Sequence, residues 1–375
     1  MDLILAHYRL GFRGGAEVVL LQLARRFNPV IYTSEYSLEN SFPEFKEFDV
    51  RIVPKNLGDV FGLPKGVRLL NYKIPQSYDV ISAHQSPSEL IRINNPRVCW
   101  TLHTPLREAF DMKDWYSSRL KYLQKTGPLA PVSHSISMGA FRFFENIAVS
   151  KIEKICPNSE VTNERLMKYL DRHDGEVVHP GIDPKAYSCD DYGKFFFYPS
   201  RLSAAKRHSY VIDAFKIFSS KHPGWKLVLA GFTSQFDAPY SIELRQMADS
   251  ANIEIIENPS QEKMRQLYAD CYATLFSAID EDFGLVILEA MAASKPVISV
   301  NEGGPTYIIL DGETGFLADS PKEMAERMSL LISDPALTEK MGKAGRNRVL
   351  GNFTVKHYLD RMEKIFKEVS AGKRA

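Results

Sequence analysis

The sequence predicts an α/β protein of two domains, each built on a parallel β-sheet with covering helices. The chain has 375 residues, of which 44% are hydrophobic, and this is enough for two ordinary domains with separate cores. In the C-terminal half, a buried strand expected at residues 273–277 is followed by a loop and by helix-forming residues at 285–293. In the N-terminal half, the spacing of short apolar runs favours parallel strands joined by helices. These runs lie at residues 3–6, 30–33, 50–53, 80–83 and 98–102.

A polar stretch marks the boundary between the two predicted domains. Residues 184–193 separate the last apolar run of the N-terminal half from an aromatic run at 195–199. We therefore expect an N-terminal domain over residues 1–185 and a C-terminal domain over residues 193–350. Residues 351–375 contain a further helix.

The composition excludes some classes of function. The net charge is +1, so the chain has no strong positive field for nucleic acid. The four cysteines have no metal-binding or redox spacing, which favours reduced thiols in a cytoplasmic protein. The first residues are too few and too polar for a signal peptide, and no run approaches the ~20 apolar residues of a membrane-spanning helix.

The stretch from Glu281 to Glu289 carries the strongest functional signal. It places two carboxylates eight positions apart, one on the loop after the expected strand and one on the helix that follows. Gly284 lets the backbone approach a ligand, and the free N–H groups of a helix N-terminus can bind hydroxyl or phosphate oxygens. A carboxylate accepts two hydrogen bonds at once, which suits a pair of neighbouring sugar hydroxyls. The alternative is that both are ordinary solvated acids.

Two other strand ends carry candidate binding residues. Arg201 and Lys206 follow the aromatic run at 195–199, and two cations at a strand end can bind a diphosphate. His103 follows the strand ending at residue 102 and precedes a Pro-containing segment, which places it at the carboxyl end of the sheet. Single histidines and surface cations more often have structural roles, so alone these signals are weak.

Near the N-terminus, Gly14 and Gly15 form a glycine-rich strand-to-helix turn. Its spacing does not match the Gly-x-Gly-x-x-Gly pattern of dinucleotide-binding proteins, which argues against a nicotinamide dehydrogenase. The pair either lines a site or simply permits a tight turn.

Together these motifs resemble those of the family-4 retaining glycosyltransferases (glycosyl transferases group 1), which have the GT-B fold. The stretch from Glu281 to Glu289 is similar to the family's Glu-x7-Glu signature, and the similarity continues to Gly303-Gly304 and to Asp311-Gly-Glu-Thr-Gly-Phe-Leu. The sequence departs from the family at Ser294, where Gly is usual, and at Tyr307, where many members have Glu. These departures leave the donor sugar less certain than the class.

The N-terminal and cationic motifs fit the same family. Gly14-Gly15-Ala-Glu resembles its glycine loop, and Arg201 with Lys206 resembles its Ser-Arg-Leu element and the lysine that follows. His103-Thr-Pro-Leu-Arg resembles a His-Thr-Pro-x-Arg string of a subset that often transfers mannose or related sugars.

The resemblance implies two Rossmann-like domains facing a cleft, with the C-terminal helix crossing back to the N-terminal domain. It also implies roles: Glu281 orients the transferred sugar, Glu289 binds the ribose diol, and His103 contacts the sugar. The expected catalytic residues are His103 and Glu281. The expected substrate-binding residues are Gly14, Gly15, Arg201, Lys206, Phe283, Gly284, Leu285 and Glu289.

No metal or other cofactor is expected. Asp280-Glu281-Asp282 spells an Asp-x-Asp triplet, which holds a divalent ion in a different transferase fold. Here the triplet overlaps the Glu-x7-Glu element. We therefore expect Arg201, Lys206 and the helix N-terminus to stabilise the leaving diphosphate without metal.

The sequence thus predicts a retaining hexosyltransferase of glycan or polysaccharide biosynthesis that uses a nucleoside diphosphate sugar, with mannose favoured. The acceptor is a glycan or a lipid-linked glycan. The basic, aromatic segment 110–123 is an ordinary amphipathic helix or a peripheral contact with the inner face of the membrane. The alternatives are a nucleotide-sugar epimerase of the same architecture and a non-catalytic nucleotide-sugar binding protein.

Overall fold

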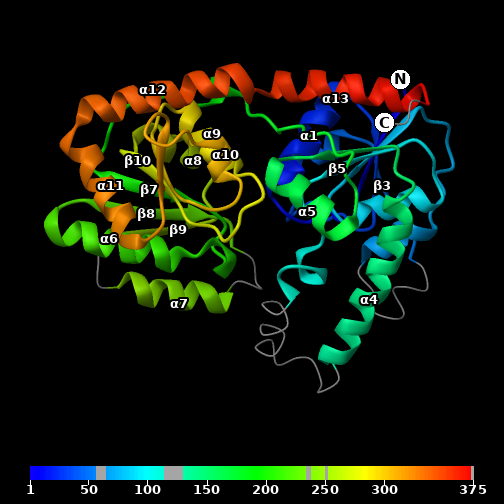
Figure 1. The fold of residues 1–375 in the computed structure, drawn as a ribbon, viewed down its shortest axis with the longest axis horizontal. Helices are drawn as coiled ribbons and strands as arrows, with labels where there is room; N and C mark the ends of the chain where they lie inside the picture. Colours follow the sequence, from blue (N-terminus) through cyan, green and yellow to red (C-terminus); the bar gives the residue numbers. More distant parts are fainter. Residues whose placement is uncertain (56–64, 114–129, 234–237, 250–251, 373–375) are drawn as a thin grey trace. The chain divides into compact units, whose positions relative to one another are not determined.

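The computed structural model of the protein describes residues 1–55, 65–113, 130–233, 238–249 and 252–372, which form two compact units (Figure 1). Unit 1 comprises residues 1–179 and 358–375, and unit 2 comprises residues 180–357. Each unit contains a parallel sheet of six strands with helices packed on it. This confirms the predicted α/β class with two Rossmann-like domains.

The sheet of unit 1 has the order β3-β2-β1-β4-β5-β6. Every residue of the central strands β1, β4 and β5 is buried, as expected for parallel strands covered on both faces. The strands are β1 (Leu3–His7), β2 (Val30–Thr33), β3 (Val50–Ile52), β4 (Val80–His84), β5 (Val98–Leu102) and β6 (Lys154–Pro157). The α-helices of this unit are α1 (Gly15–Phe27), α4 (Ala130–Val149), α5 (Glu160–Leu170) and most of α13 (Val355–Ser370).

The sheet of unit 2 has the order β12-β11-β10-β7-β8-β9. Its first and fourth strands lie at the centre, as in unit 1, so the two sheets share the doubly wound Rossmann topology. Figure 1 shows α6 and α7 on one side of this sheet and α9 and α12 on the other. The strands are β7 (Phe195–Pro199), β8 (Lys226–Gly231), β9 (Ile253–Glu257), β10 (Ala273–Phe276), β11 (Val297–Val300) and β12 (Gly315–Ala318). The α-helices are α6 (His208–Lys221), α7 (Ala238–Ala248), α8 (Gln261–Asp270), α9 (Leu285–Ala292), α10 (Pro305–Ile308), α11 (Pro321–Ser333) and α12 (Pro335–Asn352).

The C-terminal helix α13 packs on unit 1 through one apolar face. Its Phe366 contacts Phe27 of α1 edge-on, with 5.8 Å between the ring centroids. Beside this contact, Glu363 pairs with Arg26 at 3.1 Å. A buried side chain of this size contributes about 1.5–3 kcal/mol, so the apolar face, rather than the exposed ion pair, fixes the helix.

The polar stretch at 184–193 is bonded to unit 2. The N–H of Asp190 donates to the carbonyl of Ala269, and that of Gly193 to the carbonyl of Asp270, at 3.1 and 2.8 Å. The side chain of Arg346 in α12 donates to the carbonyl of Tyr187 at 3.2 Å. These bonds explain why the division between the units falls earlier, between His179 and Pro180.

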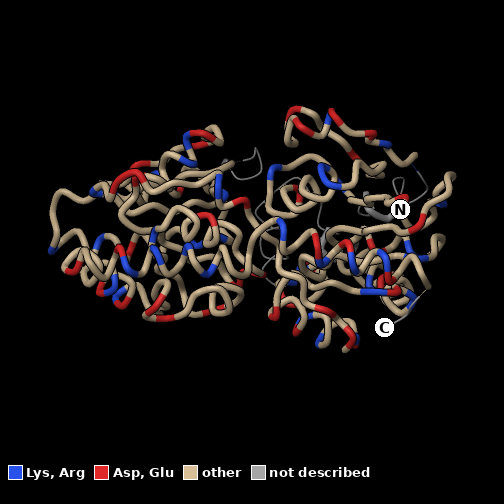
Figure 2. The backbone as a smooth tube through the Cα atoms, turned by 90° about the horizontal axis from the view of Figure 1, so that it is seen from above, with Lys and Arg blue, Asp and Glu red and all other residues tan. Residues whose placement is uncertain are grey.

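The remaining global features fit the composition. Figure 2 shows acidic and basic positions interspersed over both units. All four cysteines are free, and three of them are buried. Among the described residues, no helix is long and apolar enough to cross a membrane.

Candidate active site

Three loops of unit 2 leave the same end of its sheet and bond to one another. They follow β7, β10 and β11, which are adjacent parallel strands, so they emerge together at the carboxyl end. The N–H of Ile279 donates to the carbonyl of Ala205 at 3.0 Å, and the N–H of Gly304 to the carbonyl of Glu281 at 2.7 Å. The segments 200–207, 277–284 and 301–304 therefore form one connected surface.

Glu281 and Lys206 meet on this surface. The Lys206 Nζ lies 2.6 Å from the Glu281 Oε2, and each side chain is less than a quarter exposed. The Ser277 hydroxyl donates to the carbonyl of Lys206 at 3.2 Å, which fixes the lysine's backbone. Sequence reasoning predicted both residues for the donor site, and the structure brings them into direct contact.

Arg201 lies in the same loop, directly after β7. Its side chain is exposed, and within the described part of the chain it makes no ion pair. Arg207, four residues after the loop's turn at Ser203, is half-buried and pairs with Glu302; its Nε donates to the carbonyl of Ser277 at 2.9 Å. Arg207 thus ties the three loops together. The motif reasoning missed this role because both partners are distant in sequence.

The start of α9 completes this surface. Gly284 caps the helix with φ +106°, a left-handed conformation that favours glycine. Phe283 is buried against Phe353, with 6.1 Å between the ring centroids, while Leu285 is half-buried. In the described part of the chain no side chain caps the helix, and the N–H of Ile287 donates to the carbonyl of Gly284 at 3.0 Å, which leaves the N–H groups of Leu285 and Val286 for a ligand.

Gly303 and Gly304 pack backbone against backbone on the loop that carries Glu281. A Cβ on Gly303 would lie 2.6 Å from the carbonyl oxygen of Glu281, and one on Gly304 would lie 2.5 Å from that of Phe283. Real Cβ atoms essentially never come so close, so only glycine allows this contact. The glycine pair therefore supports the position of Glu281.

Glu289 lies on the second turn of α9 and is half-buried. Its Oε2 accepts a hydrogen bond of 2.6 Å from the Tyr268 hydroxyl. Burial raises the pKa of Glu289, and hydrogen bonding from Tyr268 and Tyr187, with the charge of Arg265, opposes that rise. Neither tyrosine was found by sequence reasoning, because no motif spacing links residues 187 or 268 to 289.

The glycine loop of unit 1 is held by a buried acid–imidazole pair. Gly14 caps α1, Gly15 is its first residue, and the N–H of Gly14 donates to the Glu17 Oε2 at 3.1 Å. The other carboxylate oxygen lies 3.2 Å from the His7 Nε2, and the His7 Nδ1 lies 3.1 Å from the carbonyl of His84. The loop is thereby tied to the ends of β1 and β4.

His103 lies at the carboxyl end of β5, as predicted, and is 9% exposed. Burial lowers the pKa of His103 to about 4; His7 acts in the same direction and Glu17 opposes it. Its ring lies 5.8 Å from that of His84, between centroids, and its Nε2 has no hydrogen-bond partner among the residues that the structure describes. A neutral imidazole with an unused nitrogen can hydrogen-bond a hydroxyl group.

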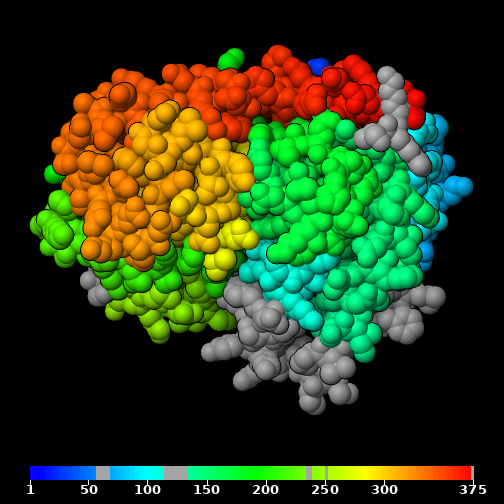
Figure 3. Space-filling view, in the orientation of Figure 1, coloured from blue at the N-terminus to red at the C-terminus, as the bar shows by residue number. Residues whose placement is uncertain are grey.

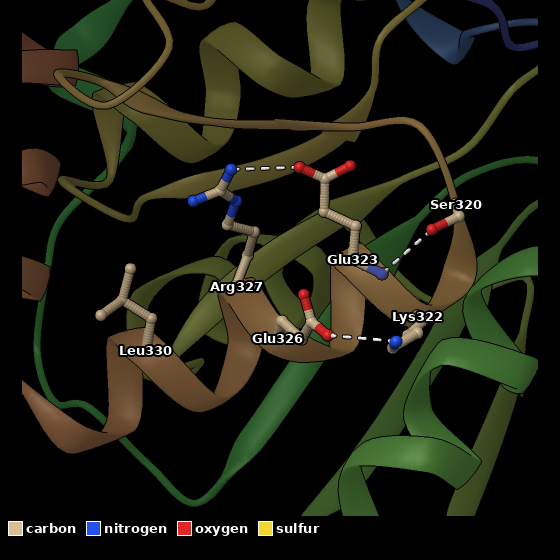
Figure 4. Close-up of a pocket in the computed structure, with 6 residues that line it drawn as sticks. All are labelled: Ser320, Lys322, Glu323, Glu326, Arg327 and Leu330. Carbon is tan, nitrogen blue, oxygen red and sulfur yellow. Dashed lines mark hydrogen bonds and ion pairs between the residues drawn. The ribbon is translucent and has the colours of Figure 1, made fainter.

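A surface groove on α11 contains none of the predicted site residues (Figure 4). Figure 3 shows α11 and α12 as an exposed orange surface of unit 2. Within the groove, Glu323 pairs with Arg327 at 3.0 Å and Lys322 with Glu326 at 4.0 Å, so its charges are internally matched. Among the described residues, no group of three or more His, Cys, Asp or Glu side chains is placed to hold a metal ion.

Comparison with known proteins identifies the class. Residues 182–348 match the family model described as Glycosyl transferases group 1. Over an alignment of 432 positions, gaps included, the chain is 24% identical to the alpha-1,3/1,6-mannosyltransferase ALG2 of Dictyostelium discoideum, with 98% of each chain covered. It is 25% identical to human ALG2, with 96% of this chain and 94% of that protein covered.

Solved structures share the fold of the whole chain. Anabaena Alr3699/HepE in complex with UDP-glucose superposes with a TM-score of 0.76 at 19% identity, covering 97% of this chain and 99% of the other. Sucrose-phosphate synthase from Thermosynechococcus elongatus gives 0.76 at 17% identity, covering 99% and 100%. The fold is therefore GT-B.

The chain has the GT-B fold, and its three-loop surface lies within the residues that match the family model. More particularly, residues 182–348 are a glycosyl transferases group 1 domain, and the protein is an enzyme of sugar transfer.

Proposed function

We propose that the protein is a retaining hexosyltransferase that moves a sugar, with mannose favoured, from a nucleoside diphosphate sugar to a glycan or lipid-linked acceptor. The observation that carries this proposal is the contact of Lys206 with Glu281, at 2.6 Å, in the loops beside the start of α9. This contact sets a cation beside a carboxylate. A nucleoside diphosphate sugar requires both, because its diphosphate is anionic and its sugar hydroxyls donate hydrogen bonds.

Leaving-group departure builds negative charge on the diphosphate. Arg201, Lys206 and the free N–H groups of α9 stabilise that charge without metal. When the diphosphate engages Lys206, Glu281 is released to accept hydrogen bonds from the sugar. Phe283, Gly284 and Leu285 bring the backbone close to the donor, and Glu289 binds the ribose diol.

Retention follows from attack on the face that the diphosphate leaves. The bond from C1 to the diphosphate oxygen breaks, the bond from C1 to the acceptor oxygen forms, and the acceptor's proton passes to the departing phosphate. His103 serves as a neutral hydrogen-bonding group for the transferred sugar, because its pKa of about 4 keeps it uncharged at neutral pH. Gly14 and Gly15 have the role of the family's glycine loop, which binds substrate.

The names of the full-length relatives support mannose. Two of them are alpha-1,3/1,6-mannosyltransferases, and the His103-Thr-Pro string points the same way. The Anabaena neighbour binds UDP-glucose, which supports a nucleotide-sugar donor without naming the base for this chain.

A cytoplasmic location with peripheral membrane contact fits a lipid-linked acceptor. Most of the segment 110–123 lies outside the described residues, but α4 exposes Ile136 and Phe143 to 68% and 62%. Exposed apolar side chains of this kind favour a lipid interface. A Phe143→Ser variant should float less with anionic liposomes, whereas Ile217→Ser on α6 should not; equal flotation of wild type and both variants would remove α4 from the interface.

The test of the function is a donor panel. Purified protein is incubated with GDP-mannose, UDP-glucose and related donors, with and without free and lipid-linked glycans. We expect acceptor-dependent release of one nucleoside diphosphate and a product whose anomeric configuration, by NMR, matches that of the donor. Epimer formed from donor alone would identify an epimerase, and binding without release under every acceptor would identify a non-catalytic protein; either result overturns the proposal.

A further inference from the structure

Tyr268 holds the Glu289 carboxylate through a short hydrogen bond. The Tyr268 hydroxyl lies 2.6 Å from the Glu289 Oε2 and 3.4 Å from the carbonyl of Val286, one turn earlier in α9. The tyrosine is 1% exposed. Its hydroxyl therefore has one strong acceptor, the carboxylate, and no bulk water to replace it.

The ring of Tyr268 is fixed by aromatic neighbours. It meets Phe197 of β7 edge-on, with 5.1 Å between the ring centroids, and Tyr187 edge-on at 5.8 Å. Because the ring is wedged between the sheet and the segment that follows residue 186, the hydroxyl cannot swing away from α9. The geometry sets the direction in which one oxygen of Glu289 points.

The same contact acts on the charge of Glu289. Burial raises the pKa of Glu289, and the opposing influences are, in order, Tyr268, Tyr187 and the charge of Arg265. These are the titratable groups that face it, from α8 and from the segment after residue 186. The two hydroxyls of a diol donate hydrogen bonds, and a protonated carboxyl would meet them with a donor of its own. Diol binding therefore needs the ionised carboxylate, which only accepts.

We propose that Tyr268, assisted by Tyr187, is a positioning residue that orients the Glu289 carboxylate so that its remaining acceptor sites receive both hydroxyls of the donor's ribose. The inference rests on the proposed function, since it assumes that Glu289 faces a nucleoside. It assigns to the hydroxyls of the buried Tyr268 and the half-buried Tyr187 a part in distinguishing ribose from deoxyribose.

The test compares isosteric variants with paired ligands. Tyr268→Phe removes one oxygen and keeps the ring. Tyr272→Phe is the matched control, because the Tyr272 hydroxyl donates to the carbonyl of Leu331 at 2.9 Å, away from Glu289. The ligands are the nucleoside diphosphate that binds the wild-type protein most tightly and its 2′,3′-dideoxy analogue, measured by calorimetry.

We expect Tyr268→Phe to weaken the ribose ligand about tenfold, the size of one hydrogen bond to a charged group, and to leave the dideoxy ligand nearly unchanged. Tyr187→Phe should act in the same direction to a smaller extent, and it keeps the inference testable if Tyr268→Phe does not fold. Tyr272→Phe should change neither affinity.

The pH profile provides a second readout. Affinity for the ribose ligand should fall as pH drops through the pKa of Glu289, because the acceptor is lost on protonation. Without the Tyr268 hydroxyl, that pKa rises, so the fall should begin at a higher pH. A purely structural tyrosine would not move this midpoint.

The outcomes separate this inference from the proposed function. If the wild-type protein itself does not distinguish the ribose ligand from the dideoxy ligand, Glu289 does not bind ribose and that part of the proposed function fails with it. If the wild type discriminates but Tyr268→Phe and Tyr187→Phe bind both ligands as the wild type does, or lose both equally, only the positioning role is overturned.

Discussion

The two units share one strand topology but place their predicted site residues in different surroundings. In unit 1, His103 is buried with a pKa of about 4, and Glu145 of α4 is buried with a pKa raised to about 8. In unit 2, Glu281 and Lys206 form an ion pair in which each side chain remains accessible to solvent. At neutral pH His103 is thus an uncharged hydrogen-bonding group, whereas Glu281 and Lys206 form an ion pair. Sheets of the same topology can therefore carry a neutral imidazole at one strand end and a charged pair at another.

The largest expected effect follows from removing the carboxylate charge in unit 2. Glu281→Gln keeps the size of the side chain but loses the charge that pairs with Lys206 and receives sugar hydroxyls. We expect kcat for sugar transfer to fall by about 10²–10³-fold, the range seen when one preorganised electrostatic group is lost. Stability should change little, because a solvent-accessible ion pair contributes at most about 1 kcal/mol.

Steady-state kinetics and urea unfolding of the same preparation check this prediction. Glu339→Gln is the control, since Glu339 pairs with Lys343 on the exposed side of α12, at 3.3 Å, away from the three loops. Wild-type turnover in Glu281→Gln would remove this carboxylate from the site.

Removing a buried carboxylate in unit 1 should change the free energy of unfolding. The Ser86 hydroxyl lies 3.1 Å from the Glu89 Oε1 and 3.4 Å from the Glu145 Oε1, and both acids are fully buried. Burial raises the pKa of both, and Glu145 further raises that of Glu89. The unfolded chain ionises near its ordinary pKa and the folded chain does not, so stability is lost as pH rises from about 4.5 to about 8.

Glu145→Gln removes this loss. At pH 8 we expect the free energy of unfolding to rise relative to wild type by up to about 5 kcal/mol, the ceiling set by a pKa raised from 4.5 to about 8 at about 1.36 kcal/mol per pKa unit. At pH 4.5 the two proteins should be equally stable. Urea titrations at the two pH values measure the difference; a constant offset at both would mean that ionisation of Glu145 is not the cause.

The glycines at the starts of α1 and α9 differ in backbone conformation. Gly284 has φ +106°, whereas Gly14 has φ −131°, an extended angle that any residue adopts. Gly284→Ala should therefore cost about 1–2 kcal/mol of unfolding free energy. Gly14→Ala should cost much less, because its Cβ would meet only the end of the Glu17 side chain, at 2.9 Å. Equal losses in thermal or urea unfolding would contradict this.

The sequence predicted the architecture well because parallel strands buried on both faces are continuous apolar runs. The runs at residues 80–83 and 98–102 became β4 and β5 almost residue for residue. Motif spacing also placed Glu281 and Lys206 on one surface. These signals are local in sequence, or tied to strand ends that the topology brings together.

The supporting residues could not be predicted in the same way. Arg207, Glu302 and Tyr268 act across about 20 to 95 positions of sequence, and their partners depend on the packing of three loops. A sequence motif also does not predict how deeply a side chain is buried. The lowered pKa of His103 follows first from its burial and then from His7, with Glu17 opposing, and both of these residues lie on other elements.

The smallest predicted effect concerns Ser294, where the family usually has glycine. Ser294 adopts φ +56°, so the backbone keeps the left-handed turn despite the side chain. Two other segments contact this turn. The carbonyl of Ser294 accepts a hydrogen bond from the Tyr192 hydroxyl at 3.1 Å, and Gly342 of α12 packs against the same carbonyl. Ser294→Gly should relieve the strain and raise the free energy of unfolding by about 0.5–1 kcal/mol, after allowance for the greater freedom of glycine in the unfolded chain.

The control is Ser220→Gly in α6, where the backbone is helical, which should lower the free energy of unfolding by about 0.5 kcal/mol. If both variants lose stability in urea, the turn at Ser294 is not strained, and the family's glycine is required there for a reason other than backbone conformation.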